Sequence, residues 1–77
     1  MEKTIEQLLN AIPHRILHNN PMKGWMEFYI SKKESYWTAG YMQWESYEVY
    51  FDSPDIKSAL TELYIWLVSN DYIQGEE

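Results

Sequence analysis

The chain of 77 residues contains no cysteine, which excludes a disulfide framework and any zinc site built from thiolates. No apolar run approaches the roughly 20 residues that span a bilayer, since the longest, LYIWLV, covers residues 63–68. The start, MEKTIEQLLN, lacks the apolar stretch and cleavage site of a signal peptide. These absences predict one small cytoplasmic domain over residues 1–77, with no membrane partner.

Positive charge is scarce in the second half of the chain. Residues 39–77 hold eight acidic residues and one basic residue, whereas residues 1–38 hold four acidic and five basic residues. The net charge of the chain is −6. An acidic half repels phosphate backbones and attracts basic surfaces. We therefore expect no direct binding to nucleic acid. The alternative is that the acidity only keeps a small aromatic domain soluble.

Aromatic residues are plentiful instead: four Trp, seven Tyr and two Phe. The stretch YWTAGYMQWESYEVYFD, residues 36–52, is the densest part. Each ring can bury roughly 150–250 Å². Aromatic mass can thus stabilise a domain of this size in place of a disulfide or metal.

A first helix is predicted over residues 4–12. Thr4 and Gln7 form a capping-box pattern. One apolar face recurs at helical spacing, and it consists of Ile5, Leu8, Leu9 and Ile12. Pro13 should end this helix or restart it as a short turn that continues the face through Ile16 and Leu17.

A second helix is predicted to run to about Asn70. Ser53 suits the N-cap, Pro54 the first helical position, and Asp55 the positive end of the helix dipole. Its core stripe consists of Ile56, Ala59, Leu60, Leu63 and Leu67. On the opposite side Ile65, Val68 and Tyr72 form a narrower apolar seam, a candidate surface for a partner or for self-association unless the first helix or a loop covers it. The tail, residues 74–77, should fray.

Three strands are predicted between the helices, after a loop over residues 18–24. In WMEFYIS, residues 25–31, the even positions should face the core. In SYEVYFD, residues 46–52, the odd positions Tyr47, Val49 and Phe51 should do so.

The middle strand, YWTAGYMQW, is ambiguous. A two-residue turn at residues 33–34 places Trp37, Ala39 and Tyr41 inside, whereas one at residues 45–46 places Gly40, Met42 and Trp44 inside. Both cannot hold, because side chains alternate with a period of two. Either one turn is longer, or a bulge interrupts the ladder within one or two residues of Gly40.

The predicted fold is therefore α+β: helix, three-stranded antiparallel meander, helix, with both helices on one face of the sheet. The other face would be exposed. Rings must then lie outside, drawn from Trp25, Tyr29, Tyr36, Tyr41, Trp44 and Tyr50. Exposed Tyr and Trp are typical of binding surfaces. The alternative is that they only form stabilising cross-strand pairs.

No pattern indicates catalysis. His14 and His18 have the spacing of two ligands on one helix face, but the glutamate of a zinc-protease motif is missing between them. There is no nucleophile elbow and no glycine-rich phosphate loop, and so small a domain has little room for a substrate pocket. We expect no enzyme activity, no metal and no cofactor.

The sequence predicts a non-enzymatic acidic module that binds a protein with a basic surface, as an inhibitor that masks a nucleic-acid-binding site would. Small anti-CRISPR and anti-restriction inhibitors from phages and mobile elements, immunity proteins and antitoxins share this size and charge. The candidate binding residues are Glu45, Glu48, Asp52, Asp55, Glu62, Trp44, Tyr50, Ile65 and Tyr72. If the acids repel one another, reversing Glu48 and Asp52 to lysine should not lower the melting temperature. The alternative is a small structural domain that forms a homodimer through the last helix or the open sheet face.

Overall fold

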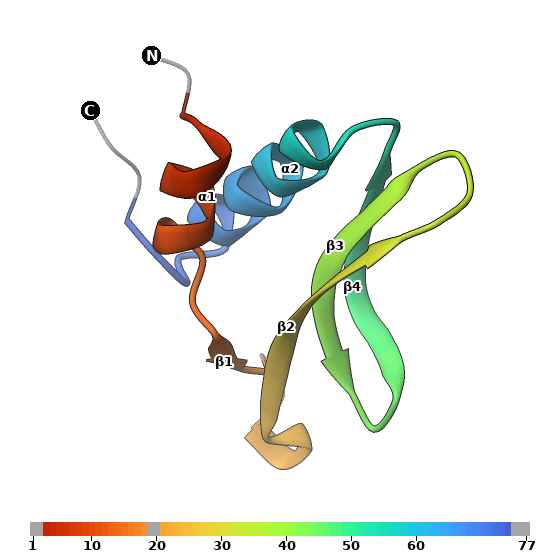
Figure 1. Cartoon of the computed structure of the whole chain (residues 1–77). Helices are drawn as coiled ribbons and strands as arrows, with labels where there is room; N and C mark the ends of the chain where they lie inside the picture. The colour runs from red at the N-terminus through yellow and green to blue at the C-terminus, as the bar shows by residue number, and fades with distance from the viewer. Residues whose placement is uncertain (1–2, 19–20, 75–77) are drawn as a thin grey trace.

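The computed structural model describes residues 3–18 and 21–74. The four strands form one antiparallel sheet in the order β1-β2-β3-β4 (Figure 1). The elements are, in chain order, α1 (Ile5–Ala11), β1 (Arg15–Leu17), η1 (Pro21–Lys23, a 3₁₀ turn), β2 (Trp25–Lys32), β3 (Trp37–Gln43), β4 (Ser46–Ser53) and α2 (Ile56–Ser69). The α+β class is confirmed, and the predicted number of three strands is wrong.

The unpredicted strand is β1, which replaces the expected restart of the first helix. After α1 the chain turns extended at Ile12, with φ −82° and ψ 122°. Ile16 then pairs with Met26 of β2, and both side chains are buried. Three residues are too few to display the alternation that identifies a strand. The apolar Ile16 therefore reaches the core from a strand and not from a helix.

The first helix begins as predicted. Gln7 N donates to Thr4 Oγ1 over 3.1 Å and Thr4 N donates to Gln7 Oε1 over 2.9 Å, which completes the capping box. Only Leu8 and Ile12 of the predicted apolar face are buried, whereas Ile5 and Leu9 are exposed. The reason is that α1 packs mainly on α2 and covers little of the sheet.

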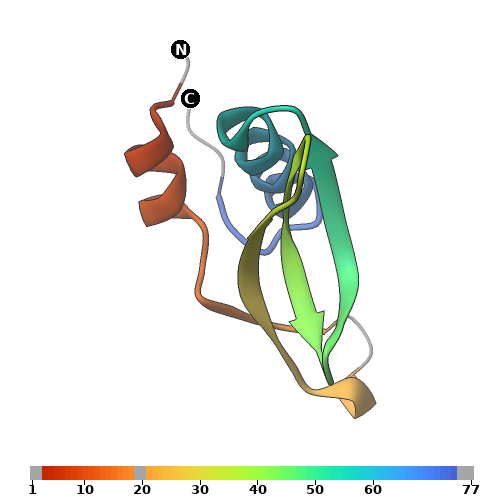
Figure 2. The same cartoon turned by 45° about the vertical axis from the view of Figure 1, so that its right-hand side comes forward.

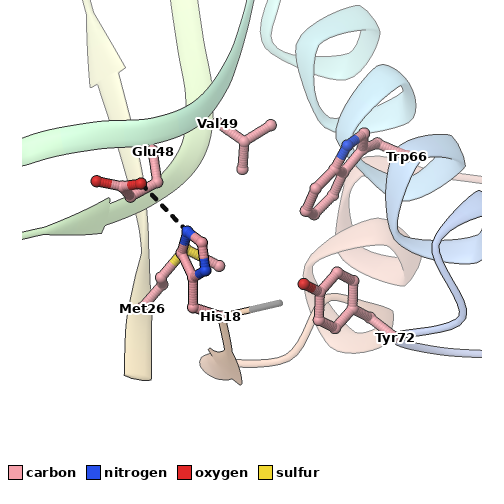
Figure 3. Close-up of a pocket in the computed structure, with 6 residues that line it drawn as sticks. All are labelled: His18, Met26, Glu48, Val49, Trp66 and Tyr72. Atoms are coloured by element: carbon pink, nitrogen blue, oxygen red, sulfur yellow. Dashed lines mark hydrogen bonds and ion pairs between the residues drawn. The ribbon is translucent and has the colours of Figure 1, made fainter. Parts of the chain in front are cut away.

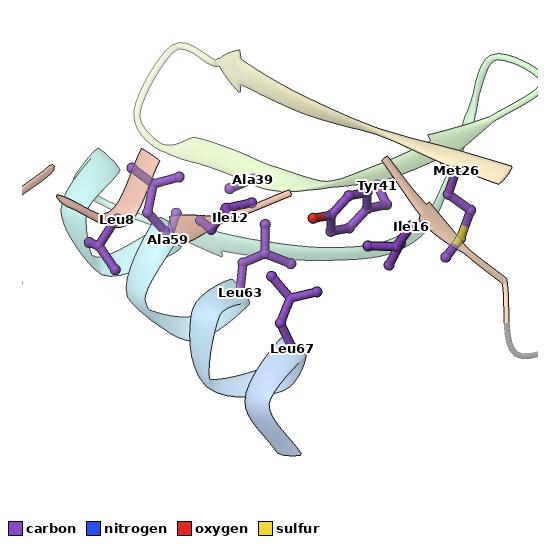
Figure 4. Packing of buried hydrophobic residues seen from close by; sticks show 10 residues of the cluster. Leu8, Ile12, Ile16, Met26, Ala39, Tyr41, Ala59, Leu63 and Leu67 are labelled. Atoms are coloured by element: carbon purple, nitrogen blue, oxygen red, sulfur yellow. The ribbon is translucent and has the colours of Figure 1, made fainter. Parts of the chain in front are cut away.

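The second helix covers the sheet. It packs on β3 and β4, and Ala59, Leu60, Leu63 and Leu67 of the predicted stripe are fully buried, whereas Ile56 is partly buried against the same core. Figure 4 shows Ala59, Leu63 and Leu67 in this layer. Its N-cap, however, is Asp55, whose carboxylate accepts from Ser58 N over 2.8 Å. The expected cap, Ser53, is the last residue of β4.

The first strand connection is longer than predicted, because Lys32 pairs with Trp37. The observed β2–β3 register differs from the predicted one by two residues, an even number that keeps each side chain on its predicted face. Ala39 and Tyr41 are accordingly fully buried, and Trp37 packs against the core. The alternative that placed Gly40, Met42 and Trp44 inside is wrong.

The predicted bulge is present. The β3–β4 register shifts between Tyr41 and Met42, because Tyr41 pairs with Val49 and Met42 with Tyr47. The extra residue is Glu48 of β4. The shift lies within two residues of Gly40, as expected, but β3 itself keeps its alternation. The bulge instead reverses the start of β4, so Tyr47, which was predicted to face inward, lies on the opposite face.

Glycine is required at position 40 because β4 approaches β3 very closely there. A Cβ on Gly40 would lie 2.1 Å from the carbonyl oxygen of Val49 and 2.7 Å from Tyr50 Cα, both backbone atoms. Any larger residue would force the two strands apart beside the bulge.

The molecule is a two-layer slab whose Cα atoms extend 35 × 34 × 16 Å. α2 covers one side of the sheet, whereas α1 lies beside α2 and covers little of the sheet, so the predicted packing of both helices on one sheet face holds only for α2 (Figures 1 and 2). No described helix covers the other side, which we call the outer face. Neither described helix has both the length and the apolar composition needed to cross a membrane. The predicted fraying at residues 74–77 falls mostly outside the described ranges.

Candidate functional site

The outer face consists of the side chains that alternate away from the core in all four strands. Four large ones are about half exposed on it: Leu17, Trp25, Tyr29 and Tyr50, at 45%, 57%, 47% and 55%. Most isolated small proteins avoid so many exposed rings on one surface. The exposed rings of this face are of the residue types in which protein interfaces are enriched.

Tyr47 contacts two other residues in the middle of this face. Its hydroxyl forms a hydrogen bond of 3.0 Å with Ser31 Oγ, and its ring packs against Tyr50 with centroids 5.6 Å apart. Since Tyr47 is on β4 and Ser31 on β2, the side chain spans β3. The position of Tyr47 is a direct consequence of the bulge.

The turn between β3 and β4 presents the most exposed ring of this surface. Trp44 and Glu45 both have positive φ, 52° and 66°, between the paired residues Gln43 and Ser46. This is the backbone of a type I′ turn, which strongly prefers Asn-Gly. Left-handed backbone at a non-glycine residue costs about 1–2 kcal/mol. The turn is thus strained at two positions, and it holds Trp44 79% exposed.

A shallow hollow of about 240 Å³ lies beside this turn, and we call it the turn hollow. Its lining combines two carboxylates, two aromatic rings and a thioether: Glu27, Glu45, Tyr29, Trp44 and Met42. Within the described ranges, no ion pair or hydrogen bond engages either carboxylate. The nearest cation in the strand register is Arg15, opposite Glu27, and its guanidinium lies over the Trp25 ring at 5.3 Å.

A second cavity, of about 170 Å³, opens on the core side near the end of α2 (Figure 3). The bulge places Glu48 there, where its Oε1 lies 3.3 Å from His18 Nε2 and 3.7 Å from Lys23 Nζ. Trp66 and Tyr72 form the opposite wall. Burial raises the pKa of Tyr72. This cavity holds one carboxylate that already has basic neighbours, so it offers less unsatisfied charge than the turn hollow.

The predicted acidic residues do not share one surface. Glu45 lies at the turn hollow, whereas Asp52 is at the other end of β4 and accepts a 2.6 Å hydrogen bond from Thr38 Oγ1. Glu48 faces the core-side cavity, and Asp55 caps α2. Glu62 is exposed on α2. Because Glu48 and Asp52 both have partners, their reversal to lysine should lower the melting temperature, whereas the sequence predicted an equal or higher one.

The predicted apolar seam on α2 is interrupted. Ile65 is exposed as expected. The helix, however, ends at Ser69 with a left-handed residue, Asp71 at φ 63°, and Tyr72 N donates to Leu67 O over 2.9 Å. This Schellman-type ending folds the chain back, and the Tyr72 ring stacks on Trp66 with centroids 5.2 Å apart. Helical spacing therefore does not extend to Tyr72.

Sequence patterns alone did not single out Glu27, Tyr29 and Met42 as site residues. The alternation in β2 predicts that Glu27 and Tyr29 lie on the outer face, so the orientation of these two side chains could be predicted from the sequence. Their meeting with Met42 and the turn depends on the register, in which Glu27 pairs with Met42 and Tyr29 with Gly40. Among the described residues, no group of three or more His, Cys, Asp and Glu side chains could hold a metal ion.

Comparisons with protein-family models, with curated proteins and with solved structures found no match to this chain.

Proposed function

We propose that this chain is a non-enzymatic acidic module that binds another protein through the outer face of its sheet. The observation that carries the proposal is the exposure of large rings on a face that no described helix covers. These rings are Trp25, Tyr29, Trp44 and Tyr50. Buried Trp and Tyr are the commonest anchors of protein interfaces. A partner that removes these rings from water would gain the hydrophobic free energy that the isolated chain forgoes.

The strained turn supports the same proposal. A turn of this type would be more stable with Asn and Gly than with Trp44 and Glu45. Backbone strain of this kind is typical of functional sites. We infer that the turn is retained for the ring it presents and not for the stability of the hairpin.

The partner that we propose offers a segment that is both apolar and basic. Among the described residues, the outer face and its turn carry the carboxylates Glu27, Glu45 and Asp52 and one cation, Arg15, which lies over the Trp25 ring. Complementary charge steers association and sets the orientation of a partner. Nucleic-acid-binding proteins carry basic surfaces of this kind. Masking such a protein, in the manner of phage anti-defence inhibitors, immunity proteins or antitoxins, is the form of the function that we propose.

Self-association through the same face is the second candidate, because exposed rings suit a second copy as well. In a two-fold dimer, however, both copies would contribute the same predominantly acidic face, and like charges across an interface oppose binding. The charge of the face therefore favours a different, basic partner. The exposed Ile65 on α2 offers a separate surface for a homodimer.

The test is a selection of random dodecapeptides displayed on phage against the immobilised chain. Counter-selection uses a Trp44→Asn, Tyr50→Thr variant, which removes two outer-face rings. We expect enriched peptides that contain both basic and apolar residues, bind more weakly as salt rises, and shift the amide resonances of the outer face. An Ile65→Ser variant is the matched control, since it removes an equally exposed apolar side chain from α2.

Three outcomes would overturn the proposal. The first is a selection that enriches no peptide. The second is enriched peptides whose resonance shifts fall on α2 or on the core-side cavity, or which the Ile65→Ser variant fails to bind. The third is a dimer in sedimentation velocity that Tyr50→Thr dissociates, because the outer face would then be occupied by a second copy.

A further inference from the structure

The turn hollow has a chemistry more specific than that of the rest of the outer face. Two carboxylates, Glu27 and Glu45, share it with the rings of Tyr29 and Trp44. Aromatic faces attract cations through their quadrupole, and carboxylates attract them through charge. A hollow that combines both suits a cation with a flat, weakly hydrated surface.

We propose that the turn hollow binds the guanidinium group of an arginine side chain. This inference rests on the proposed function, since the arginine is to come from the protein partner. A guanidinium is planar, stacks on aromatic faces and presents its N–H donors in a fork that matches carboxylates. A lysine ammonium is compact and more strongly hydrated, so it would gain less from the rings.

The molecule already contains one example of this contact on the same face. The guanidinium of Arg15 lies 5.3 Å from the centroid of the Trp25 ring. In the strand register Arg15 is opposite Glu27, yet no ion pair joins them within the described ranges. The second indole, Trp44, has no such cation over it among the described residues. The hollow beside Trp44 is thus the position that an arginine from outside can occupy.

Glu27 and Glu45 come from different parts of the sheet. Glu27 is on β2, paired with Met42, and Glu45 is in the turn that follows β3. The left-handed backbone at positions 44 and 45 fixes the direction in which the side chains of Trp44 and Glu45 leave the turn. Selectivity for arginine therefore depends on the strained turn as well as on the strand register.

The test is an NMR titration of the whole chain with N-acetyl-arginine amide. The readout is the indole N–H resonance of Trp44, which is assigned by its loss in Trp44→Phe. The lysine analogue keeps the positive charge, and the citrulline analogue keeps the shape without the charge. We expect a saturable shift with a dissociation constant on the order of millimolar for arginine. Binding of the lysine analogue should be at least about threefold weaker, and citrulline should give no saturable shift.

Matched variants assign the binding to the hollow. Glu27→Gln and Glu45→Gln should each weaken arginine binding by about fivefold or more, because each removes a charged acceptor of nearly the same size. Glu62→Gln loses the same charge from exposed α2 and should change binding by less than about twofold. Arg15→Gln removes the internal cation opposite Glu27 and should not weaken it.

Equal binding of arginine and citrulline, or of arginine and lysine, would overturn the assignment of a guanidinium site. Equal losses in Glu62→Gln and Glu45→Gln would reduce the effect to net charge and would overturn the assignment to the hollow. These failures are distinguishable from failure of the proposed function. Selected peptides that bind the outer face without arginine would leave that function standing while removing this inference.

Discussion

The two faces of the sheet are formed by the same strands and carry similar aromatic rings, but the rings are buried on the inner face and exposed on the outer face. On the inner face Tyr41 is fully buried and its hydroxyl donates to Pro13 O over 2.8 Å. On the outer face Tyr50 is 55% exposed, and its hydroxyl has no protein partner among the described residues. The inner ring belongs to the core cluster, whereas the outer ring packs against Tyr47 on the same sheet face. Tyr41 therefore contributes to the stability of the fold, whereas most of Tyr50 remains in contact with solvent.

The largest effect should come from truncating the inner layer. Leu63 is fully buried at the centre of the α2–sheet contact. Leu63→Ala should lower the free energy of unfolding by about 2–5 kcal/mol, the range for large core truncations. Equilibrium unfolding in urea measures it. A loss under about 1 kcal/mol would mean that the inner layer is not the main source of stability.

A matched pair of tyrosines sharpens the comparison. Tyr41→Phe leaves the Pro13 carbonyl without its donor and should cost about 1–2 kcal/mol. Tyr50→Phe removes an exposed hydroxyl and should stay within about 0.5 kcal/mol of wild type. Urea unfolding of both variants tests this. Similar losses in the two would contradict the distinction between the faces.

The same pair should differ at alkaline pH. Burial raises the pKa of Tyr41 well above its ordinary value, so the native state keeps this proton after the unfolded chain has released it. The unfolded tyrosine titrates near pH 10. The contribution of Tyr41 to stability is therefore complete below about pH 10 and decreases as the pH rises above it. Wild type and Tyr50→Phe should lose stability more steeply there than Tyr41→Phe, and parallel slopes would refute the expectation.

A smaller effect should come from Asp71, whose backbone is left-handed like that of Trp44 and Glu45. Asp71 has φ 63° at the end of α2, where glycine is favoured. Asp71→Gly should raise the free energy of unfolding by about 0.5–1 kcal/mol without changing the binding of selected peptides. Thermal unfolding and titration measure the two quantities. A loss of peptide binding would contradict the confinement of the site to the outer face.

The smallest effect concerns the bulge carboxylate. Glu48→Gln removes the charge that lies near His18 and Lys23, and it should cost about 0.5 kcal/mol at neutral pH, as partly exposed ion pairs do. Glu62→Gln, an exposed helix position, should be neutral within error. A gain in stability for Glu48→Gln would instead support the sequence prediction that repulsion among the acidic residues lowers stability.

Much of the fold was predictable from local patterns. The capping box at Thr4 and Gln7, the stripe on α2 and the inward positions of β2 each depend on neighbours in sequence. Strand β1 was not predictable, because three residues carry no clear period. The cap at Asp55 was displaced from Ser53 because β4 continues through Ser53 and pairs it with Trp37.

The candidate site was predictable only in part. The conflict between the two hairpins indicated a bulge near Gly40, and the exposed rings of Trp44 and Tyr50 were expected. The turn hollow depends on the register between β2 and β3, which pairs Glu27 with Met42, and that register is decided by contacts between strands. A one-residue change in register exchanges every side chain between the two faces. The same reason explains why Glu48, predicted to join an acidic surface, lies on the core side instead.

The strained turn offers the most direct test that the outer face serves binding at the expense of stability. The double variant Trp44→Asn, Glu45→Gly gives the turn the residues that its left-handed backbone prefers. Urea unfolding and titration with a peptide selected on the wild-type chain are measured on the same preparation. We predict that the free energy of unfolding rises by about 1–2 kcal/mol while the affinity for the peptide falls at least about tenfold. A variant that is less stable than wild type, or that binds the peptide equally well, would contradict the account.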